Sequence, residues 1–328
     1  MNMLDRLKEA ISPEVREGEP MSRHTTYRIG GPAEFFFEAR SSKDAVRAVQ
    51  TARELGLPYF VFGGGSNILV ADGGVKGLVV KMLNNGIDIQ DTRVAAESGA
   101  SSGLVAVKAT EAGLTGLEWA AGLPGTIGGA IRGNAGAHGG EMKDSVAAVL
   151  VLRDGIEVTM SPDDCRFGYR DSVFKREPYW VILSAVLQLE RSVDPEAGRE
   201  LHRQNLERRN RTQPVDRPSS GCAFVNWRPN GQDEIDSLRR SLDLNKDEEI
   251  PFTPLGTVPA GWIIDRAQLK GMKVGHAMVS EKHGNFIVHD GEATADDIIA
   301  LLGAVKMRIR NMTNSVVQLQ EEVEYVGF

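Results

Sequence analysis

The chain has 328 residues, of which 41% are hydrophobic and 25% charged, and this composition is ordinary for a globular protein of two or three domains. Its formal charge of −7 argues against nucleic acid or an anionic membrane as the main partner, because such partners bind basic surfaces. No apolar run could span a membrane, residues 1–19 have no signal-peptide core, and the histidines and cysteines show no metal-ligand spacing, so we expect a cytoplasmic protein without a bound metal.

The N-terminal part of the sequence predicts two helices around one strand. The first helix ends near Ile11, and the aromatic run Phe35–Phe37 forms the strand. The second helix runs from Asp44 to Leu55, with Ser42 as the expected N-cap and Gly56 as the residue that ends it.

A first glycine cluster lies between two short apolar runs. Tyr59–Phe62 predicts a buried strand, residues 63–67 (GGGSN) a tight loop, and Ile68–Val70 a second strand. The dinucleotide fingerprint must open a helix and the P-loop requires a G-K-[ST] ending, so neither motif is present. The cluster therefore indicates a phosphate site of another architecture.

A second glycine-rich stretch follows a helix predicted for Leu104–Ala112. Residues 122–140 (GLPGTIGGAIRGNAGAHGG) contain eight glycines in nineteen residues. Without a Cβ, successive backbone N–H groups can converge on an anion, and a diphosphate fits best. A flexible linker or a set of packing turns is the alternative, but Leu123, Ile127 and the preceding Trp119 favour an ordered loop with its own core.

The middle of the chain alternates between strands and a charged helix. Val146–Leu152 and Trp180–Leu189 predict strands, and Pro195–Arg211 an arginine-rich helix with a solvated face. Pro214 and Pro218 mark a domain boundary. The alternation indicates a mixed α+β fold.

The C-terminal part begins with a turn of small residues at 219–226 that leads into a strand. Residues 230–257 are polar and flanked by prolines, which predicts an excursion from the fold. A capping box at 294–297 opens a helix over Ile298–Arg310, and the chain ends in a strand at Glu322–Val326.

Seven motifs in this order resemble one enzyme family, the UDP-N-acetylenolpyruvoylglucosamine reductases. They are residues 26–31 (TYRIGG), 63–67, 122–139, 169–172 (YRDS), 261–265 (GWIID), 280–286 (SEKHGNF) and 322–323 (EV). Each motif alone is weak, but chance would have to supply every spacing independently. The short step from Phe174 to Trp180 resembles the subtype that lacks an extra tyrosine-bearing loop.

The resemblance implies an α+β fold with two FAD-binding subdomains of the vanillyl-alcohol-oxidase type and a C-terminal α+β substrate-binding domain. Residues 1–82 with 317–328 would form the first subdomain, 83–213 the second, and 214–316 the substrate-binding domain. The residues implied to contact FAD are Tyr27, Arg28, Gly63, Gly64, Gly65, Ser66, Asn67, Gly125, Thr126, Gly128, Gly129 and Asn134.

The implied reaction passes a hydride from NADPH through FAD to an enolpyruvyl ether of UDP-N-acetylglucosamine, in peptidoglycan precursor synthesis. Arg170 matches the arginine that stabilises the enolate, and Glu322 the C-terminal acid. Cys222 stands where most members carry the proton-donating serine. A lone cysteine is more often a buried small hydrophobe, but a thiol with a reference pKa of about 8.5 is neutral at pH 7 and more acidic than a hydroxyl.

One departure from the family concerns substrate binding. Tyr169, Asn226 and Lys270 are the residues expected to bind the UDP-sugar, but Val225 replaces the usual lysine. Lys270 or Arg228 would supply the missing charge.

Two other functions stay open at this point. A flavin oxidase of the same fold would lack Arg170, Cys222 and Glu322 together, and in a non-catalytic flavin- or nucleotide-binding module the three would be incidental. We expect a small-molecule UDP-sugar as the partner, and no nucleic acid. The sequence leaves the oligomeric state open, with a monomer favoured.

Overall fold

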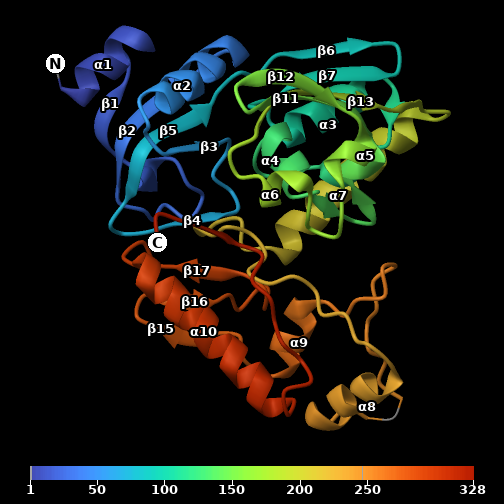
Figure 1. Ribbon diagram of the computed structural model, residues 1–328. Helices are drawn as coiled ribbons and strands as arrows, with labels where there is room; N and C mark the ends of the chain where they lie inside the picture. Colours follow the sequence, from blue (N-terminus) through green and yellow to red (C-terminus); the bar gives the residue numbers. More distant parts are fainter. Residues whose placement is uncertain (1, 246) are drawn as a thin grey trace. The chain divides into compact units, whose positions relative to one another are not determined.

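The computed structural model describes residues 2–245 and 247–328, in two units that we treat separately (Figure 1). Unit 1 comprises residues 1–20, 32–65 and 74–209. Unit 2 comprises residues 21–31, 66–73 and 210–328, so two short N-terminal segments belong with the C-terminal part of the chain.

The first sheet of unit 1 has four strands. Their order is β1-β2-β5-β3, for β1 (Arg16–Pro20), β2 (Pro32–Ala39), β5 (Val75–Met82) and β3 (Tyr59–Phe62). Strands β2, β5 and β3 are parallel and β1 is antiparallel to β2. Helices α1 (Met3–Ala10) and α2 (Ser42–Glu54) complete this layer, and α2 buries Ala45, Ala48, Val49 and Ala52 in a core shared with the sheet.

Helix α2 shows one error of the sequence prediction. The N-cap is Ser41 and not Ser42, because the Ser41 side chain accepts from the backbone N–H of Asp44, and Ser41 has extended backbone angles. Residue type alone cannot decide which of two adjacent serines is the N-cap, since the hydroxyl of either could accept from the N–H three residues later. Strand β3 also differs from expectation: of its residues only Phe62 is buried.

The second sheet of unit 1 is antiparallel throughout, in the order β12-β11-β13-β7-β6. The strands are β6 (Ile87–Gln90), β7 (Arg93–Glu97), β11 (Val146–Arg153), β12 (Ile156–Met160) and β13 (Val181–Gln188). Its core includes Ile127 of the second glycine stretch and Trp119 just before it, which confirms that this stretch is ordered.

Short elements surround this sheet. The helices are α3 (Ser102–Glu111), α4 (Ile127–Arg132), α5 (Pro162–Cys165), α6 (Val173–Arg176) and α7 (Pro195–Thr212), with 3₁₀ turns at Glu118–Ala120 and Met142–Asp144. Two-residue strands pair as β8 (Leu114–Thr115) with β14 (Glu190–Arg191), and β9 (Gly136–Ala137) with β10 (Gly140–Glu141). Helix α7 has no buried residue, as its charge pattern predicts.

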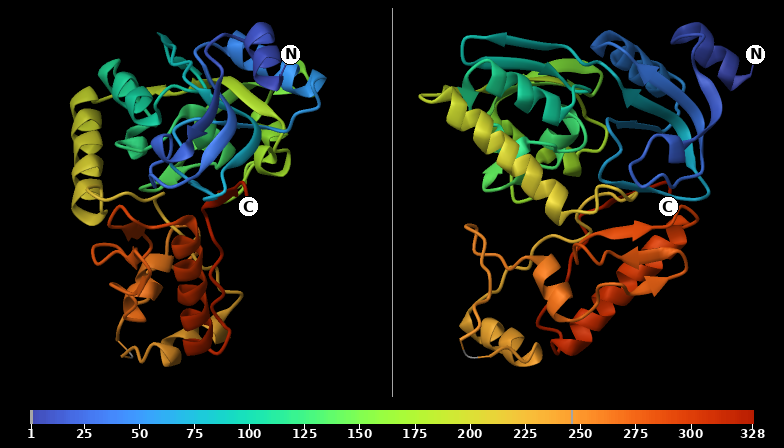
Figure 2. Two further views of the ribbon diagram at one scale, coloured as in Figure 1. Left: turned by 90° about the vertical axis from the view of Figure 1, so that its left-hand side faces the viewer. Right: turned by 180° about the vertical axis from the view of Figure 1, so that it is seen from behind.

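Unit 2 contains a three-stranded antiparallel sheet covered by one long helix. The sheet is β15 (Lys273–Val274), β16 (Ala277–Val279) and β17 (Ile287–His289), and α10 (Ala295–Met312) packs against it (Figures 1 and 2). The capping box of Thr294 and Asp297 is present, and the buried side chains of α10 are those of the predicted apolar face: Ile298, Leu301, Leu302, Val305 and Ile309.

The remaining elements of unit 2 bring distant segments together. Strand β18 (Glu324–Val326) pairs in parallel with β4 (Ile68–Val70), and a 3₁₀ turn covers Met21–Arg23. The predicted excursion at 230–257 contains α8 (Gln232–Ser241), whose Leu238 is fully buried, and α9 (Ala260–Arg266) follows it. The strand expected after residues 219–226 is reduced to isolated bridges.

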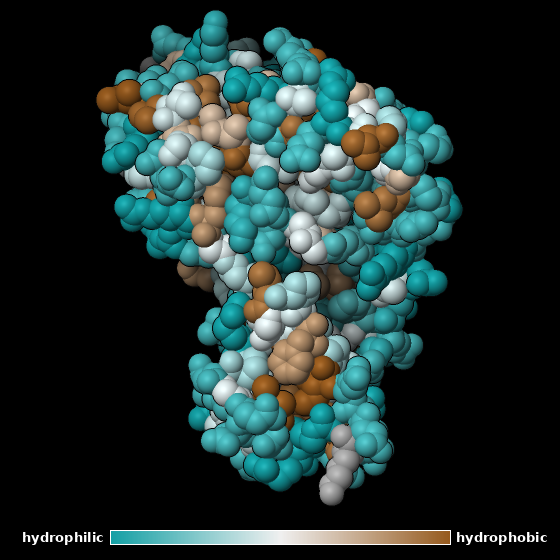
Figure 3. Space-filling model, turned by 90° about the vertical axis from the view of Figure 1, so that its right-hand side faces the viewer, coloured by the Kyte–Doolittle hydropathy of each residue, from teal (hydrophilic) through white to brown (hydrophobic). Residues whose placement is uncertain are grey.

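Most of the surface drawn in Figure 3 is hydrophilic, with apolar side chains in small groups. Exposed apolar side chains of this kind are normal for folded proteins. Within residues 2–245 and 247–328, no helix is long and apolar enough to cross a membrane.

Candidate active site

Two glycines of the first cluster, Gly63 and Gly64, contact the second glycine stretch within unit 1. A Cβ on Gly63 would lie 2.1 Å from Thr126 Oγ1, and a Cβ on Gly64 would lie 2.8 Å from the Cα of Gly125. Gly125 itself has a φ of +96°, which favours glycine. The two loops therefore approach backbone to backbone, at a distance that side chains would prevent.

The second loop leads directly into α4. Thr126 is the N-cap of this helix and accepts from the backbone N–H of Gly129 (3.5 Å), while Gly128 N–H donates to the carbonyl of Ser98 (2.9 Å). A Cβ on Gly128 would approach the Ser98 Cβ to 2.9 Å. Gly128 is thus required for close packing, and its backbone donor is used within the protein.

This packing predicts that Gly64→Val loses FAD. Two γ-methyl groups at this position would force the 63–65 loop away from Gly125, and the pocket for a diphosphate would be lost with the loop geometry. We expect a variant with little or no flavin absorbance after purification. Gly73→Val is the matched control, because a Cβ there meets no atom within 4 Å. Full retention of FAD by Gly64→Val would contradict this account.

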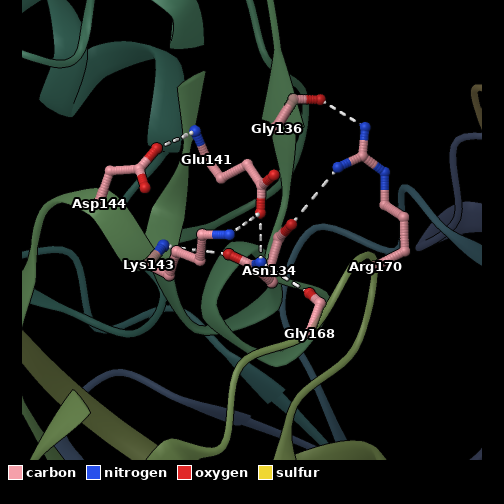
Figure 4. Close-up of polar contacts among 7 residues, drawn as sticks. All are labelled: Asn134, Gly136, Glu141, Lys143, Asp144, Gly168 and Arg170. Atoms are coloured by element: carbon pink, nitrogen blue, oxygen red, sulfur yellow. Dashed lines mark hydrogen bonds and ion pairs between the residues drawn. The ribbon is translucent and has the colours of Figure 1, made fainter. Parts of the chain in front are cut away.

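A hydrogen-bond network holds Arg170 in unit 1 (Figure 4). Its guanidinium donates to the carbonyl of Gly136 (2.6 Å) and to that of Asn134 (3.4 Å). Arg170 has a φ of +54°, so the backbone of this loop is fixed in an uncommon conformation. Two carbonyl acceptors hold the guanidinium in one orientation, as a preorganised anion-stabilising group requires.

Asn134 is the centre of this network. Its Nδ2 donates to Glu141 Oε2 (2.7 Å) and to the carbonyl of Gly168 (2.8 Å), and its Oδ1 accepts from Lys143 N–H (3.0 Å). The Glu141 carboxylate also lies 3.3 Å from Lys143 Nζ. The Asn134 amide therefore joins the end of the glycine stretch to the loop that carries Tyr169 and Arg170, where the Arg170 guanidinium lies 5.3 Å from the Tyr169 ring centroid.

Cys222 and Glu322 lie on adjacent extended segments of unit 2. Glu322 N–H donates to the carbonyl of Ala223 (2.8 Å), and Phe224 forms an antiparallel bridge with Glu321. On its other side, Cys222 forms a bridge with Phe286. The backbone of Glu322 is thus paired with Ala223, the residue after Cys222, and Cys222 is half-buried.

The structure also separates Glu322 from its neighbour Glu321. Glu321 Oε1 accepts from Lys306 Nζ (2.8 Å) and Oε2 from the Tyr325 hydroxyl (2.5 Å), so this carboxylate belongs to a structural network. Burial, followed by the hydrogen bond to Glu321, raises the pKa of Tyr325 above its usual value. Asn67 Nδ2 donates to the carbonyl of Glu322 (3.0 Å), which places one residue of the first glycine cluster beside the acid.

The loop that carries Tyr27 and Arg28 packs within unit 2. His289 Nε2 hydrogen-bonds to the carbonyl of Tyr27 (2.6 Å), and Arg28 has a φ of +57°. Burial raises the pKa of Tyr27 to about 12. The nearby Ser220 hydroxyl acts in the opposite direction, but its effect is smaller. Among the described residues neither hydroxyl has a hydrogen-bond partner of good geometry, although both are buried.

These observations fit a bound flavin nucleotide. The glycine loops of unit 1 approach each other without side chains, as a diphosphate cradle requires. In unit 2, the buried hydroxyls of Tyr27 and Ser220 have unused hydrogen-bonding capacity, which a polar ligand would satisfy.

Two predicted substrate residues have partners within unit 2. Asn226 Oδ1 accepts from Ala260 N–H (3.2 Å) at the start of α9, and Lys270 Nζ lies 2.7 Å from Asp265 Oδ2. Asn226 therefore links the segment after Cys222 to the start of α9. The ion pair leaves Lys270 partly exposed.

The structure adds three residues that the sequence analysis missed as parts of the site. Glu141 orders Asn134, His289 holds the carbonyl of Tyr27, and Asn285 binds the segment after Cys222. Asn285 lies in one of the seven motifs, and that was the available signal. No feature of the sequence indicated Glu141 or His289, because their partners are known only from the fold.

Comparisons with known proteins agree with this site. A family model described as "FAD binding domain" matches residues 33–161, and the model of the UDP-N-acetylenolpyruvoylglucosamine reductase C-terminal domain matches residues 213–326. The enzyme of that name from Caldanaerobacter subterraneus is 35% identical, over 99% of this chain and 98% of its own length. The one from Rubrobacter xylanophilus is 36% identical over 99% of both chains.

A solved structure shows the same architecture. The crystal structure of UDP-N-acetylenolpyruvylglucosamine reductase from Thermus caldophilus matches with a TM-score of 0.74 and 30% identity, covering 95% of this chain and 98% of that one. The fold is therefore the two-subdomain FAD-binding fold with a C-terminal α+β domain. With relatives above 30% identity over nearly their whole length, the chain belongs to the UDP-N-acetylenolpyruvoylglucosamine reductase family.

Proposed function

We propose that Arg170, Cys222 and Glu322 perform the charge and proton chemistry of this family's reaction. The chain is a flavoenzyme that reduces UDP-N-acetylglucosamine enolpyruvate to UDP-N-acetylmuramate with NADPH, in peptidoglycan precursor synthesis. The observation that carries the proposal is the backbone hydrogen bond from Glu322 to Ala223, which brings the segments of Glu322 and Cys222 side by side.

Bound FAD would supply the hydride-transfer chemistry between NADPH and the vinyl carbon of the substrate. For its diphosphate we propose the glycine clusters, with Gly63, Gly64, Gly65 and Gly125 as backbone and Ser66, Asn67 and Thr126 as side-chain contributors. Tyr27 and Arg28 would line the ring system. Gly128, Gly129 and Asn134 would act mainly by shaping the loop. The Gly128 and Gly129 N–H groups donate to Ser98 and Thr126, and the Asn134 amide binds Glu141 and Gly168.

Arg170 stabilises the negative charge that the hydride leaves on the substrate. This charge develops on the carbon next to the carboxylate and delocalises into it, which gives a planar dianion. A guanidinium matches two carboxylate oxygens with two parallel N–H donors. The support is the anchoring of Arg170 by the carbonyls of Gly136 and Asn134, which fixes the group before the charge forms.

Cys222 then protonates the carbon. The Sγ–H bond breaks, the proton goes to the substrate carbon, and the thiolate is later reprotonated by solvent, so hydride and proton together saturate the double bond. Glu322 faces the developing enolic carboxylate in this proposal and assists as an acid. The support is its fixed backbone, which is held by Ala223 on one side and Asn67 on the other.

The remaining proposals concern substrate binding, the domain bounds, the cellular location and the oligomeric state. Tyr169, Asn226 and Lys270 bind the UDP-sugar. Residues 1–82 with 317–328, 83–213, and 214–316 form the three domains; the support is that each of the three largest sheets falls within one range. The enzyme acts in the cytoplasm as a monomer, which suits a site whose three catalytic residues come from one chain.

Product analysis in air tests this function against its rivals. Purified protein is incubated with NADPH and the enolpyruvyl substrate while dioxygen uptake is followed. The proposal expects one UDP-N-acetylmuramate for each NADPH consumed, with uptake of dioxygen far below that. A flavin oxidase would consume dioxygen without this product, and a binding module would produce no turnover.

A further inference from the structure

One side chain of unit 2 binds the backbone directly after Cys222. Phe224 N–H donates to Asn285 Oδ1 (3.0 Å), and Asn285 Nδ2 donates to the carbonyl of the same residue, Phe224 (2.7 Å). The Asn285 amide thus imitates the peptide group of a neighbouring strand. We call this pair of hydrogen bonds to Phe224 the Asn285 clamp. The amide oxygen and the amide nitrogen both bind Phe224. They therefore fix the direction of the chain at Phe224 and its distance from Asn285.

The main chain of Asn285 extends this contact toward Cys222. Ala223 N–H donates to the Asn285 carbonyl (2.7 Å), and the next pair of the ladder is the bridge between Cys222 and Phe286. Asn285 therefore supplies the partner for three backbone groups of Ala223 and Phe224, the two residues after the cysteine. Residues 222–226 form no regular strand: Glu322 N–H and the Gln320 carbonyl bind one edge of this segment, and Asn285 binds the other.

Asn285 is itself held rigidly. It is 3% exposed, and its N–H donates to His283 Nδ1 (3.1 Å). Burial, and then the charge of Lys270, lower the pKa of His283, so its ring stays neutral near pH 7 and can accept this bond. A Cβ on Gly261 of α9 would come within 3.3 Å of the Asn285 Cβ, so a glycine there admits the clamp.

We propose that Asn285 is a positioning residue for proton delivery by Cys222. A cysteine side chain has one rotatable bond before its sulfur, so the location of Sγ follows the backbone of residue 222. A shift of about 1 Å in the donor can cost roughly 10²-fold in rate. This inference rests on the proposed role of Cys222 as proton donor.

The variant Asn285→Asp tests the clamp through pH. The introduced carboxyl group, when protonated, keeps one donor and one acceptor for Phe224; when ionised, it can only accept and faces the Phe224 carbonyl. Burial beside that carbonyl raises the pKa of the introduced group. Its clamp is therefore intact at low pH and is lost as the pH rises through that pKa.

Other titratable groups border this site and are present in every variant. They are His283 on the same segment, with Lys270 and Asp265 near it, Cys222, and Glu321, Glu322 and Lys306 on the far side of residues 222–224. The pH profiles of the wild type and of Asn285→Leu show how these groups affect the rate. Leucine serves this purpose because it has a similar volume and cannot hydrogen-bond to Phe224 at any pH.

The measurement is anaerobic stopped-flow of both half-reactions in the purified holoenzyme between pH 6 and pH 9. For Asn285→Asp we expect reoxidation of the reduced flavin by the enolpyruvyl substrate to slow about 10- to 100-fold at high pH and to recover toward pH 6. Reduction by NADPH should change less than about twofold. Asn285→Leu should stay slow at every pH. Equal losses in both half-reactions, or a wild-type pH profile for Asn285→Asp, would overturn the inference.

Thr313→Val is the matched structural control. The Thr313 hydroxyl is buried in the same unit and also binds two backbone groups, donating to the Ile309 carbonyl (2.8 Å) and accepting from Val317 N–H (3.1 Å). We expect it to lower the melting temperature as much as Asn285→Leu, with both half-reactions unchanged. A loss of reoxidation rate in Thr313→Val as large as in Asn285→Leu would mean that general destabilisation explains the effect.

Two further measurements separate this inference from the proposed function. The rate of iodoacetamide alkylation at Cys222 should change in Asn285→Asp between pH 6 and pH 9 relative to wild type. In a Cys222→Ala background, Asn285→Asp should add no further loss, because residues acting through one group are not additive. Full activity of Cys222→Ala would overturn the proposed function; an additive loss in the double variant would overturn this inference alone.

Discussion

Replacing Cys222 with alanine is expected to slow the reoxidation of reduced flavin by the enolpyruvyl substrate by about 10²- to 10⁴-fold, the usual contribution of a positioned general acid. The methyl group of alanine cannot supply the proton that the substrate carbon needs. Reduction of the flavin by NADPH should continue at the wild-type rate, since it needs no proton from this residue. Stopped-flow measurement of the two half-reactions separates these effects.

Cys222→Ser is the matched control. A hydroxyl keeps one proton in a similar place, so much of the rate should remain. The wild-type rate should fall at alkaline pH as the thiol ionises, because only the protonated form can donate. The serine variant should lack this fall, since a hydroxyl does not ionise in that range.

Alkylation provides an independent test of the same residue. The other cysteine, Cys165, is fully buried, and burial raises its pKa to about 11, with Asp164 adding to the effect. Iodoacetamide reacts with thiolates, so modification near neutral pH reports on Cys222. Inactivation should be prevented by substrate. If Cys222→Ala keeps the full rate of flavin reoxidation, the proton comes from another group, and Glu322 becomes the candidate.

Arg170→Lys is expected to lose about 10²- to 10³-fold in the same half-reaction, the usual cost of one preorganised donor to a developing oxyanion. Lysine keeps the charge but has no planar fork, so it cannot bind two carboxylate oxygens in parallel or reach both carbonyls that hold Arg170. Flavin reduction by NADPH should be less affected, because the substrate dianion has not yet formed.

Arg176→Lys is the matched control for this substitution. Arg176 ion-pairs with Asp171 from the same loop region and is about half exposed, and such exposed pairs contribute little. We expect nearly wild-type rates in both half-reactions. Losses of equal size in the two half-reactions of Arg170→Lys would show that Arg170 maintains the loop and does not act on the substrate.

Elements with strong periodicity could be predicted from the sequence. The apolar face and the capping box of α10 are both local patterns, and the structure confirms them. The order of the second glycine stretch was also predictable, because Ile127 inside the stretch and Trp119 just before it are core residues. The choice between Ser41 and Ser42 as the N-cap of α2 was not predictable, since a shift of the N-cap by one residue leaves the sequence pattern unchanged.

The supporting residues of the site were not predictable from local patterns. Asn285 and Phe224 are 61 positions apart, and His289 and Tyr27 are 262 apart. Nothing near an asparagine in the sequence indicates which distant backbone its amide will bind. Glu322 is an intermediate case: the register of the C-terminal motif favours it over Glu321 in the sequence, and the structure adds that the Glu321 carboxylate binds Lys306 and Tyr325.

The most direct test of the whole account follows the flavin of the wild-type protein under argon. NADPH alone should bleach the absorbance of the bound FAD, and the reduced state should persist. Addition of the enolpyruvyl substrate should restore the absorbance, with one UDP-N-acetylmuramate formed for each flavin reoxidised. A protein that binds no FAD, or whose reduced flavin is not reoxidised by this substrate, would contradict the account.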